Sequence, residues 1–308
     1  MWQWQAILHR FGILTKEKVI DLKFFTYYEG STLKPGVKTV NGLLDISGVV
    51  SNINELVQLH SNEANWMELT GFIEEKENSS PAYLDESSIT MGPCVDKPGK
   101  IICVGLNYQK HAEESGMAAP KLPVLFNKYH NTLAGTGEAI TIPAHAREID
   151  YEAELALVIG KKAKNVATEE AKDYIFGYSA ANDLSARDLQ FLTNQWLLGK
   201  NLDGFCPLGP YLVTHDEIQD ANALDISCKV NGEVRQQSNT SDMIFNCEEI
   251  VSFISRHMTL EPGDVILTGT PEGVILGYEE ERRNWLRAGD EVVVEIEGLG
   301  QLKNVLQS

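Results

Sequence analysis

The sequence has few of the features that mark secreted or membrane-bound proteins. Its five cysteines are an odd number without any C-x-x-C spacing, which fits neither a disulfide framework nor a zinc site. The first residues contain no basic segment followed by an apolar stretch, so no secretory signal is expected. No apolar run approaches the roughly 18–20 residues that a membrane-spanning helix needs. These absences predict a cytoplasmic protein with reduced thiols.

Basic side chains are also scarce. The chain holds 26 lysines and arginines against 44 aspartates and glutamates, which gives a formal net charge of −18. Nucleic acids and anionic membranes both attract clustered lysine and arginine side chains. The composition therefore predicts neither a nucleic acid nor a membrane as a partner.

The length of 308 residues suits one large domain with a smaller one. A turn-rich passage near residues 80–98 contains three prolines, which disfavour the interiors of helices and sheets. We place a boundary there, between a small N-terminal domain over residues 1–95 and a larger domain over residues 96–308. In the small domain, two strands over residues 2–22 and a helix over residues 54–77 are predicted.

Strand signals dominate the larger domain, as short runs rich in apolar and β-branched residues. Asn231-Gly232 lies between two such runs and is typical of a type I′ hairpin turn. Asn246 and Glu249 form a capping-box pattern that predicts a helix to about Met258. Helices are few and do not alternate regularly with strands, so the predicted fold is mainly β with short helices (α+β). Further predicted strands cover residues 101–105, 124–127, 139–142, 151–160 and 178–183.

Acidic residues interrupt two of these apolar strands. Side chains alternate along a strand, so Glu152 and Glu154 are expected on one face, about 6.5–7 Å apart at their Cα atoms. Two carboxylates this close repel each other unless a positive charge lies between them, or unless they lie on a solvent-facing strand edge. Asp183 ends another apolar stretch, where an unpartnered charge is unfavourable. Three carboxylates from two strands suit a hard divalent cation such as Mg²⁺.

Six motifs in the larger domain make the chain resemble the fumarylacetoacetate hydrolase family. They keep the family's order, and together they are far more specific than any one alone. The motifs are G-L-N-Y-x-x-H-A-x-E (Gly105–Glu114), F-x-K (Phe126–Lys128), D-Y-E-x-E-L-A (Asp150–Ala156), N-D-x-S-A-R-D-x-Q (Asn182–Gln190), G-K-x-x-D-G-F-x-P-x-G-P (Gly199–Pro210) and T-G-T-P-x-G-V (Thr268–Val274).

The resemblance implies the family's mixed β-sandwich roll, usually as a homodimer, and a set of site residues. The implied Mg²⁺ or Mn²⁺ ligands are Glu152, Glu154 and Asp183. The implied catalytic residues are His111, Glu114 and Lys200, with the first two on a mobile lid. The implied substrate-binding residues are Lys128, Arg187, Gln190 and Thr270.

The resemblance also implies a reaction on a small anionic 2-oxo acid. The leading expectation is a metal-dependent hydrolase that cleaves a C–C bond of an acylpyruvate or fumarylacetoacetate-type 2,4-dioxo acid through a metal-stabilised enolate. His111, backed by Glu114, would deprotonate the attacking water. Oxaloacetate decarboxylase and 2-hydroxyhepta-2,4-diene-1,7-dioate isomerase remain as alternatives, and so does a catalytically silent protein that binds metal and ligand.

One departure from the family pattern narrows these expectations. Animal fumarylacetoacetases take a further aspartate ligand from the loop before the catalytic histidine. The corresponding loop here, Gly105–His111, contains Asn107 and no aspartate. The sequence therefore matches the bacterial three-carboxylate branch, and fumarylacetoacetate itself is not the expected substrate.

Overall fold

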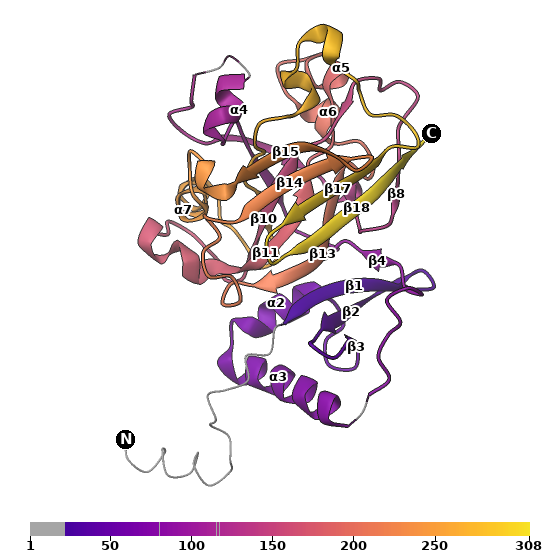
Figure 1. Ribbon diagram of the computed structural model, residues 1–308. Coiled ribbons are helices and arrows are strands. Elements are labelled where there is room, and N and C mark those ends of the chain that lie inside the picture. The colour runs from indigo at the N-terminus through magenta and orange to yellow at the C-terminus, as the bar shows by residue number, and fades with distance from the viewer. Residues whose placement is uncertain (1–21, 80, 115, 117) are drawn as a thin grey trace.

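The computed structural model describes residues 22–79, 81–114, 116 and 118–308. The strands predicted over residues 2–22 therefore lie almost wholly outside the described part. Figure 1 shows a larger region built mainly of strands and a smaller region that holds α2 (Ile53–His60) and α3 (Glu63–Asn78).

The described residues form one long sheet in the strand order β3-β2-β1-β13-β11-β10-β16-β5-β6. Its central strands β10 (Ala153–Ile159), β11 (Ile175–Asn182) and β13 (Cys206–Thr214) are buried along their whole length, which explains why they lack the apolar–polar alternation of a half-exposed strand. The other strands are β1 (Lys23–Glu29), β2 (Thr32–Lys38), β3 (Leu43–Asp45), β5 (Ile101–Gly105), β6 (Val124–Lys128) and β16 (Val265–Leu267), with β4 (Met91–Gly92) beside β1 and β7 (Leu133–Ala134) beside β13.

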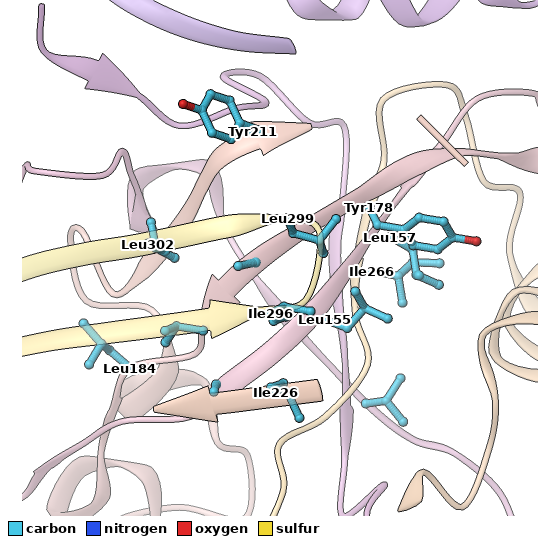
Figure 2. Close-up of a cluster of buried hydrophobic side chains, with 14 of the residues drawn as sticks. Leu155, Leu157, Tyr178, Leu184, Tyr211, Ile226, Ile266, Ile296, Leu299 and Leu302 are labelled. Carbon is cyan, nitrogen blue, oxygen red and sulfur yellow. The ribbon is translucent and has the colours of Figure 1, made fainter. Parts of the chain in front are cut away.

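A second sheet packs against the middle of the first. Its strand order is β15-β14-β17-β18-β8, and alternate residues of β17 are buried, as expected for a sheet with one face in the core. Figure 2 shows Leu155 and Leu157 of β10 beside Ile296 and Leu299 in this core. The strands are β15 (Glu233–Asn239), β14 (Asp225–Val230), β17 (Glu291–Ile296), β18 (Gly300–Gln307) and β8 (Ala139–Thr141). The mainly β fold with short helices is confirmed.

The N-terminal region extends the long sheet, because β1 pairs antiparallel with β13. On one face of that sheet, Ile53 and Leu56 of α2 join the same buried cluster as Ala156 and Val158 of β10. The ring of His60 lies 5.0 Å from that of Phe176 in β11. The division into domains at residues 95 and 96 stays a prediction.

One turn and one helix cap form as their residues predict, and one helix differs from its predicted range. Asn231 and Gly232 both have positive φ, 51° and 81°, in the turn between β14 and β15. α7 (Cys247–His257) begins with the capping box of Asn246 and Glu249. The helix predicted over residues 54–77 is instead two helices, because the Asn62 side chain caps α3 by accepting hydrogen bonds from the next backbone N–H groups.

The remaining elements are short. None of the helices in the described residues combines the length and the apolar content that crossing a bilayer requires. The short elements are α4 (Gln109–Glu114), α5 (Arg187–Gln190), α6 (Leu197–Lys200), β9 (Ile149–Asp150), β12 (Ser185–Ala186), η1 (His130–Thr132), η2 (Thr168–Tyr174), η3 (Thr240–Asp242), η4 (Ile275–Gly277) and η5 (Glu280–Arg282).

Candidate active site

A cavity of about 560 Å³ opens beside the start of β10, a volume within the range of small-molecule sites. Its walls come from α4, from the α5–α6 segment and from the chain that follows β16. In Figure 1, α4, α5 and α6 lie at the end of the molecule away from α3. The polar lining residues include His111, Glu114, Glu152, Glu154, Arg187, Gln190, Lys200 and Thr270.

Three carboxylates meet at the inner end of this cavity, where Glu152 and Glu154 line it and Asp183 lies behind its wall. Ala153 of β10 pairs with Asn182 of β11, so Glu152, just before Ala153, lies next to Asp183, just after Asn182. The Asp183 N–H donates to the Glu152 carbonyl oxygen at 2.9 Å. Glu154 lies on the same face of β10 as Glu152. Oxygen atoms of the three side chains lie within 4.8 Å of one another, and all three residues are buried.

Buried cations bind two of these carboxylates. The Lys200 Nζ lies 2.7 Å from both Glu152 Oε2 and Asp183 Oδ2, and Arg187 Nη2 lies 2.6 Å from Glu152 Oε1. Burial alone would raise the pKa of Glu152, but Lys200 and Arg187 outweigh it and lower the pKa to about 2. The same carboxylates raise the pKa of Lys200, although burial opposes them.

Glu154 has no such partner. Its Oε2 accepts a hydrogen bond from the Gly269 N–H at 2.7 Å, and no ion pair in the described part of the chain includes it. Burial, Asp183 and Glu152 together raise the pKa of Glu154 well above its ordinary value. The buried cluster thus has one more carboxylate than it has cations. Its carboxylates are Asp150, Glu152, Glu154 and Asp183, and its cations are Lys128, Arg187 and Lys200.

A divalent cation would more than offset this excess negative charge and leave the cluster with a net positive charge that suits an anionic ligand. Three carboxylates supply the hard oxygen ligands that Mg²⁺ and Mn²⁺ prefer, and the cavity leaves room for water or substrate on the open side. Glu152, Glu154 and Asp183 are therefore a group that could hold a metal ion, as the sequence predicts.

His111 and Glu114 lie on α4 at the cavity wall. The His111 Nδ1 is 3.5 Å from Glu114 Oε2. The Gly273 N–H donates to the Glu114 carboxylate at 3.1 Å, and a side chain at Gly277 would collide with that carboxylate. The chain after β16 thus fixes Glu114, and Glu114 in turn faces the histidine. This geometry suits a proton-transferring pair.

Comparison with known proteins identifies the family. The family model described as fumarylacetoacetate (FAA) hydrolase C-terminal matches residues 100–307. The chain belongs to the fumarylacetoacetate hydrolase family. The oxaloacetate tautomerase fahd2, mitochondrial, of Xenopus laevis is 47% identical over 229 residues, which are 74% of this chain and 71% of that protein.

Solved structures of the fumarylacetoacetate hydrolase family share this architecture. The fumarylacetoacetate hydrolase of psychrophilic Exiguobacterium antarcticum matches with a TM-score of 0.77 and 33% identity, covering 93% of this chain and 99% of that one. A maleylpyruvate hydrolase of a Sphingobium species, in complex with manganese(II) and pyruvate, matches with a TM-score of 0.76 and 28% identity, covering 93% and 100%.

In this member of the fumarylacetoacetate hydrolase family, Asp150 organises the site although the sequence argument did not single it out. Its carboxylate is fully buried and accepts hydrogen bonds from Arg187 Nε at 2.9 Å and from the N–H groups of Ile275 and Leu276. Arg187 also donates to the Gln190 side chain. The sequence did contain a signal for this role of Asp150. It is a charged residue just before a buried strand, and a buried charge requires partners.

Two further buried amides position the loop after β16. The Gln236 side chain donates to Thr270 Oγ1 at 2.8 Å and to the Pro271 carbonyl at 2.9 Å. Asn107 donates to the Thr268 carbonyl at 2.7 Å. Asn107 stands inside a recognised motif, whereas Gln236 belongs to the second sheet and carries no sequence signal for this contact.

Two of the predicted site residues lie behind the cavity wall. Lys128 is buried with its Nζ 2.5 Å from Asp183 Oδ1 and 3.3 Å from the Leu184 carbonyl. Neither Lys128 nor Asp183 is among the residues that line the cavity. Lys128 therefore contacts Asp183 here, and its contact with substrate stays a prediction. The roles assigned to the other predicted residues stay predictions.

Replacing Asp150 with asparagine should weaken the whole site. The change leaves Arg187 buried with one carboxylate instead of two, and breaking a buried ion pair commonly costs about 3–5 kcal/mol. We expect a lower melting temperature and a lower affinity for Mg²⁺, measured by thermal unfolding and by calorimetric titration. Asp188→Asn is the matched control, because Asp188 accepts only from backbone N–H groups near the surface. Equal stability of Asp150→Asn and wild type would contradict the organising role.

Proposed function

We propose that this enzyme binds a small anionic 2-oxo acid and catalyses the keto–enol interconversion of oxaloacetate. The observation that carries the proposal is the carboxylate triad with Lys200 held between Glu152 and Asp183, beside a cavity that His111 and Glu114 also line. The 47% identity to the Xenopus laevis oxaloacetate tautomerase supports the choice of substrate.

Each group has a definite task in this reaction. Glu152, Glu154 and Asp183 would hold a divalent ion, which would supply Lewis-acid chemistry at the substrate's keto oxygen. Lys200 stabilises the negative charge that develops on that oxygen, in a buried site where such electrostatic stabilisation is strong. With Nδ1 directed at Glu114, the His111 Nε2 is the nitrogen available to take the C3 proton from the keto form. Protonation of the enolate oxygen then gives the enol, and the reverse two transfers give back the keto form. Tautomerisation consumes no water, because it needs only these two proton transfers.

Hydrolysis of an acylpyruvate-type C–C bond is the second candidate. The same His111–Glu114 pair could deprotonate a water, and a structurally similar family member is a maleylpyruvate hydrolase crystallised with manganese(II) and pyruvate. Decarboxylation of oxaloacetate would place negative charge on the same keto oxygen. We propose Mg²⁺ or Mn²⁺ as the metal for each of these reactions.

Product analysis separates the candidates. The protein is incubated with Mg²⁺ or Mn²⁺ and either oxaloacetate or acetylpyruvate, and pyruvate is measured with a coupled assay while the enol absorbance is recorded. The proposal expects rapid change in the enol absorbance of oxaloacetate with little pyruvate. Rapid pyruvate formation from acetylpyruvate with no effect on the enol would instead support hydrolysis.

We also propose a homodimer in the cytoplasm. β6 is the last strand of the long sheet, and α6 packs against it with Leu197 and Leu198 exposed. An edge strand next to exposed apolar side chains suits pairing with a second copy of the chain. All five cysteines are free and buried, in keeping with a reducing compartment. Light scattering should give twice the chain mass of 34.2 kDa; a monomer at micromolar concentration would contradict the dimer.

A further inference from the structure

One arginine in the cavity wall, Arg283, is available to contact a ligand. Among the described residues, Arg187, Lys200 and Arg283 are the lysine and arginine side chains that line it. The first two are bound to Glu152 at 2.6 and 2.7 Å. Arg283 follows η5 and is half-buried, and no ion pair in the described part of the chain includes it.

A single hydrogen bond and a well-anchored loop hold Arg283 in place. Its Nε donates to the Tyr278 carbonyl oxygen at 2.8 Å. The Tyr278 hydroxyl donates to the Gly273 carbonyl at 3.2 Å, and Tyr151 of the sheet donates to the same carbonyl at 2.8 Å. The loop is thus tied to the site, while the two terminal nitrogens of Arg283 keep their donors for a ligand.

We propose that Arg283 binds the distal carboxylate of a dicarboxylic 2-oxo acid and so makes the site select dicarboxylates over 2-oxo acids with uncharged tails. The inference rests on the proposed function and adds to it the residue that recognises the second carboxylate of oxaloacetate. A guanidinium presents a planar pair of donors that matches a carboxylate.

Acidic side chains at the cavity make a positively charged partner important for the binding of a dicarboxylate. Glu279 and Glu280 also line the cavity and would repel a second negative charge on the ligand. Both are exposed, so water and salt weaken their field more than that of the half-buried Arg283. Arg283 therefore outweighs this weakened repulsion and favours substrates with two carboxylates.

A neighbouring arginine provides a matched control. Arg283 also borders a second cavity, of about 370 Å³, together with Arg235, Arg282 and Arg287. Arg282 lines that second cavity but not the first. Replacing Arg282 removes the same charge from the same loop without removing a group from the proposed ligand contact.

The test compares the binding of two ligands that differ only at the distal end. 2-Oxoglutarate and 2-oxopentanoate have the same carbon chain, and only the former ends in a carboxylate. Calorimetry with Mg²⁺-loaded protein should show wild type binding 2-oxoglutarate about tenfold or more tighter, as expected for a charged hydrogen bond. Arg283→Gln should bind the two ligands equally, with its affinity for 2-oxopentanoate unchanged. Arg282→Gln should keep the wild-type preference, and Arg283→Lys should keep part of it.

Several results would overturn the inference. These are a preference that survives in Arg283→Gln, a preference lost equally in Arg282→Gln, or a wild type that binds both ligands equally or not at all. Because the readout is binding, the outcome does not depend on turnover. A protein that fails to interconvert the oxaloacetate tautomers but shows the Arg283-dependent preference would refute the proposed function and support this inference.

Discussion

Replacing Glu154 with glutamine is expected to stabilise the metal-free protein while abolishing its metal binding. Glu154 is buried beside Glu152 and Asp183 and forms no ion pair with any described residue, so its charge opposes folding. Glutamine keeps the size and the acceptor for the Gly269 N–H but removes the charge. Affinity for Mg²⁺ should fall by at least about 100-fold, since loss of even an outer-shell partner commonly costs about 10–100-fold.

The effect on stability should depend on pH in a defined direction. The folded pKa of Glu154 lies well above its ordinary value of 4.5, so the folded state retains a proton that the unfolded state releases. The metal-free wild type is therefore most favoured below the unfolded pKa and loses stability as pH rises toward the folded pKa. The gain in melting temperature of Glu154→Gln over wild type should grow as the pH rises from about 4.5.

Thermal unfolding with and without Mg²⁺ checks both halves of this expectation. Wild type should gain stability from added Mg²⁺, whereas Glu154→Gln should not respond. Glu170→Gln, which changes an exposed carboxylate of η2, should behave as wild type. A variant that is less stable than wild type without metal, or that still responds fully to Mg²⁺, would refute the metal assignment.

Replacing His111 with alanine should remove most of the activity and leave metal binding intact. The imidazole lies at the cavity wall and meets Glu114 but contacts none of the three carboxylates through a hydrogen bond or ion pair of the described residues. Loss of a general acid–base group lowers kcat by about 10²–10⁴-fold. Enol absorbance kinetics and Mg²⁺ titration measure the two properties separately.

The same variant distinguishes the ways in which His111 could act. If the pair activates water, acetylpyruvate hydrolysis falls far more than oxaloacetate decarboxylation, because decarboxylation needs no water. If it moves the C3 proton, tautomerisation suffers the large loss. His145→Ala, an exposed histidine away from the cavity, is the control. Full tautomerase activity in His111→Ala would exclude the proton-transfer role.

Local patterns predicted part of this site well. Alternation along a strand was enough to place Glu152 and Glu154 on one face. The position of Asp183 beside them depends on the pairing of Ala153 with Asn182. The residues alone suggested a shared cation site for the three carboxylates, and the family resemblance implied the same ligand set, but neither gave this register.

The parts that the sequence did not reveal are contacts between distant segments. Asp150 is held by backbone N–H groups of Ile275 and Leu276, and Gln236 reaches the loop of Thr270 from the other sheet. The ion pair between Lys128 and Asp183 is likewise a contact that the sequence did not reveal. In the N-terminal region, one helix was predicted over residues 54–77, and the cap at Asn62 divides that range into two helices.

The central claim is a metal-dependent interconversion of the keto and enol forms of a 2-oxo acid in this cavity. The most direct measurement follows the enol absorbance of freshly dissolved oxaloacetate with wild-type protein, first with Mg²⁺ and then with excess chelator. The account predicts a rate far above the uncatalysed one with Mg²⁺, a return to the uncatalysed rate with chelator, and recovery when Mg²⁺ is restored. A rate that is the same with metal and with chelator, or no acceleration under either condition, would contradict it.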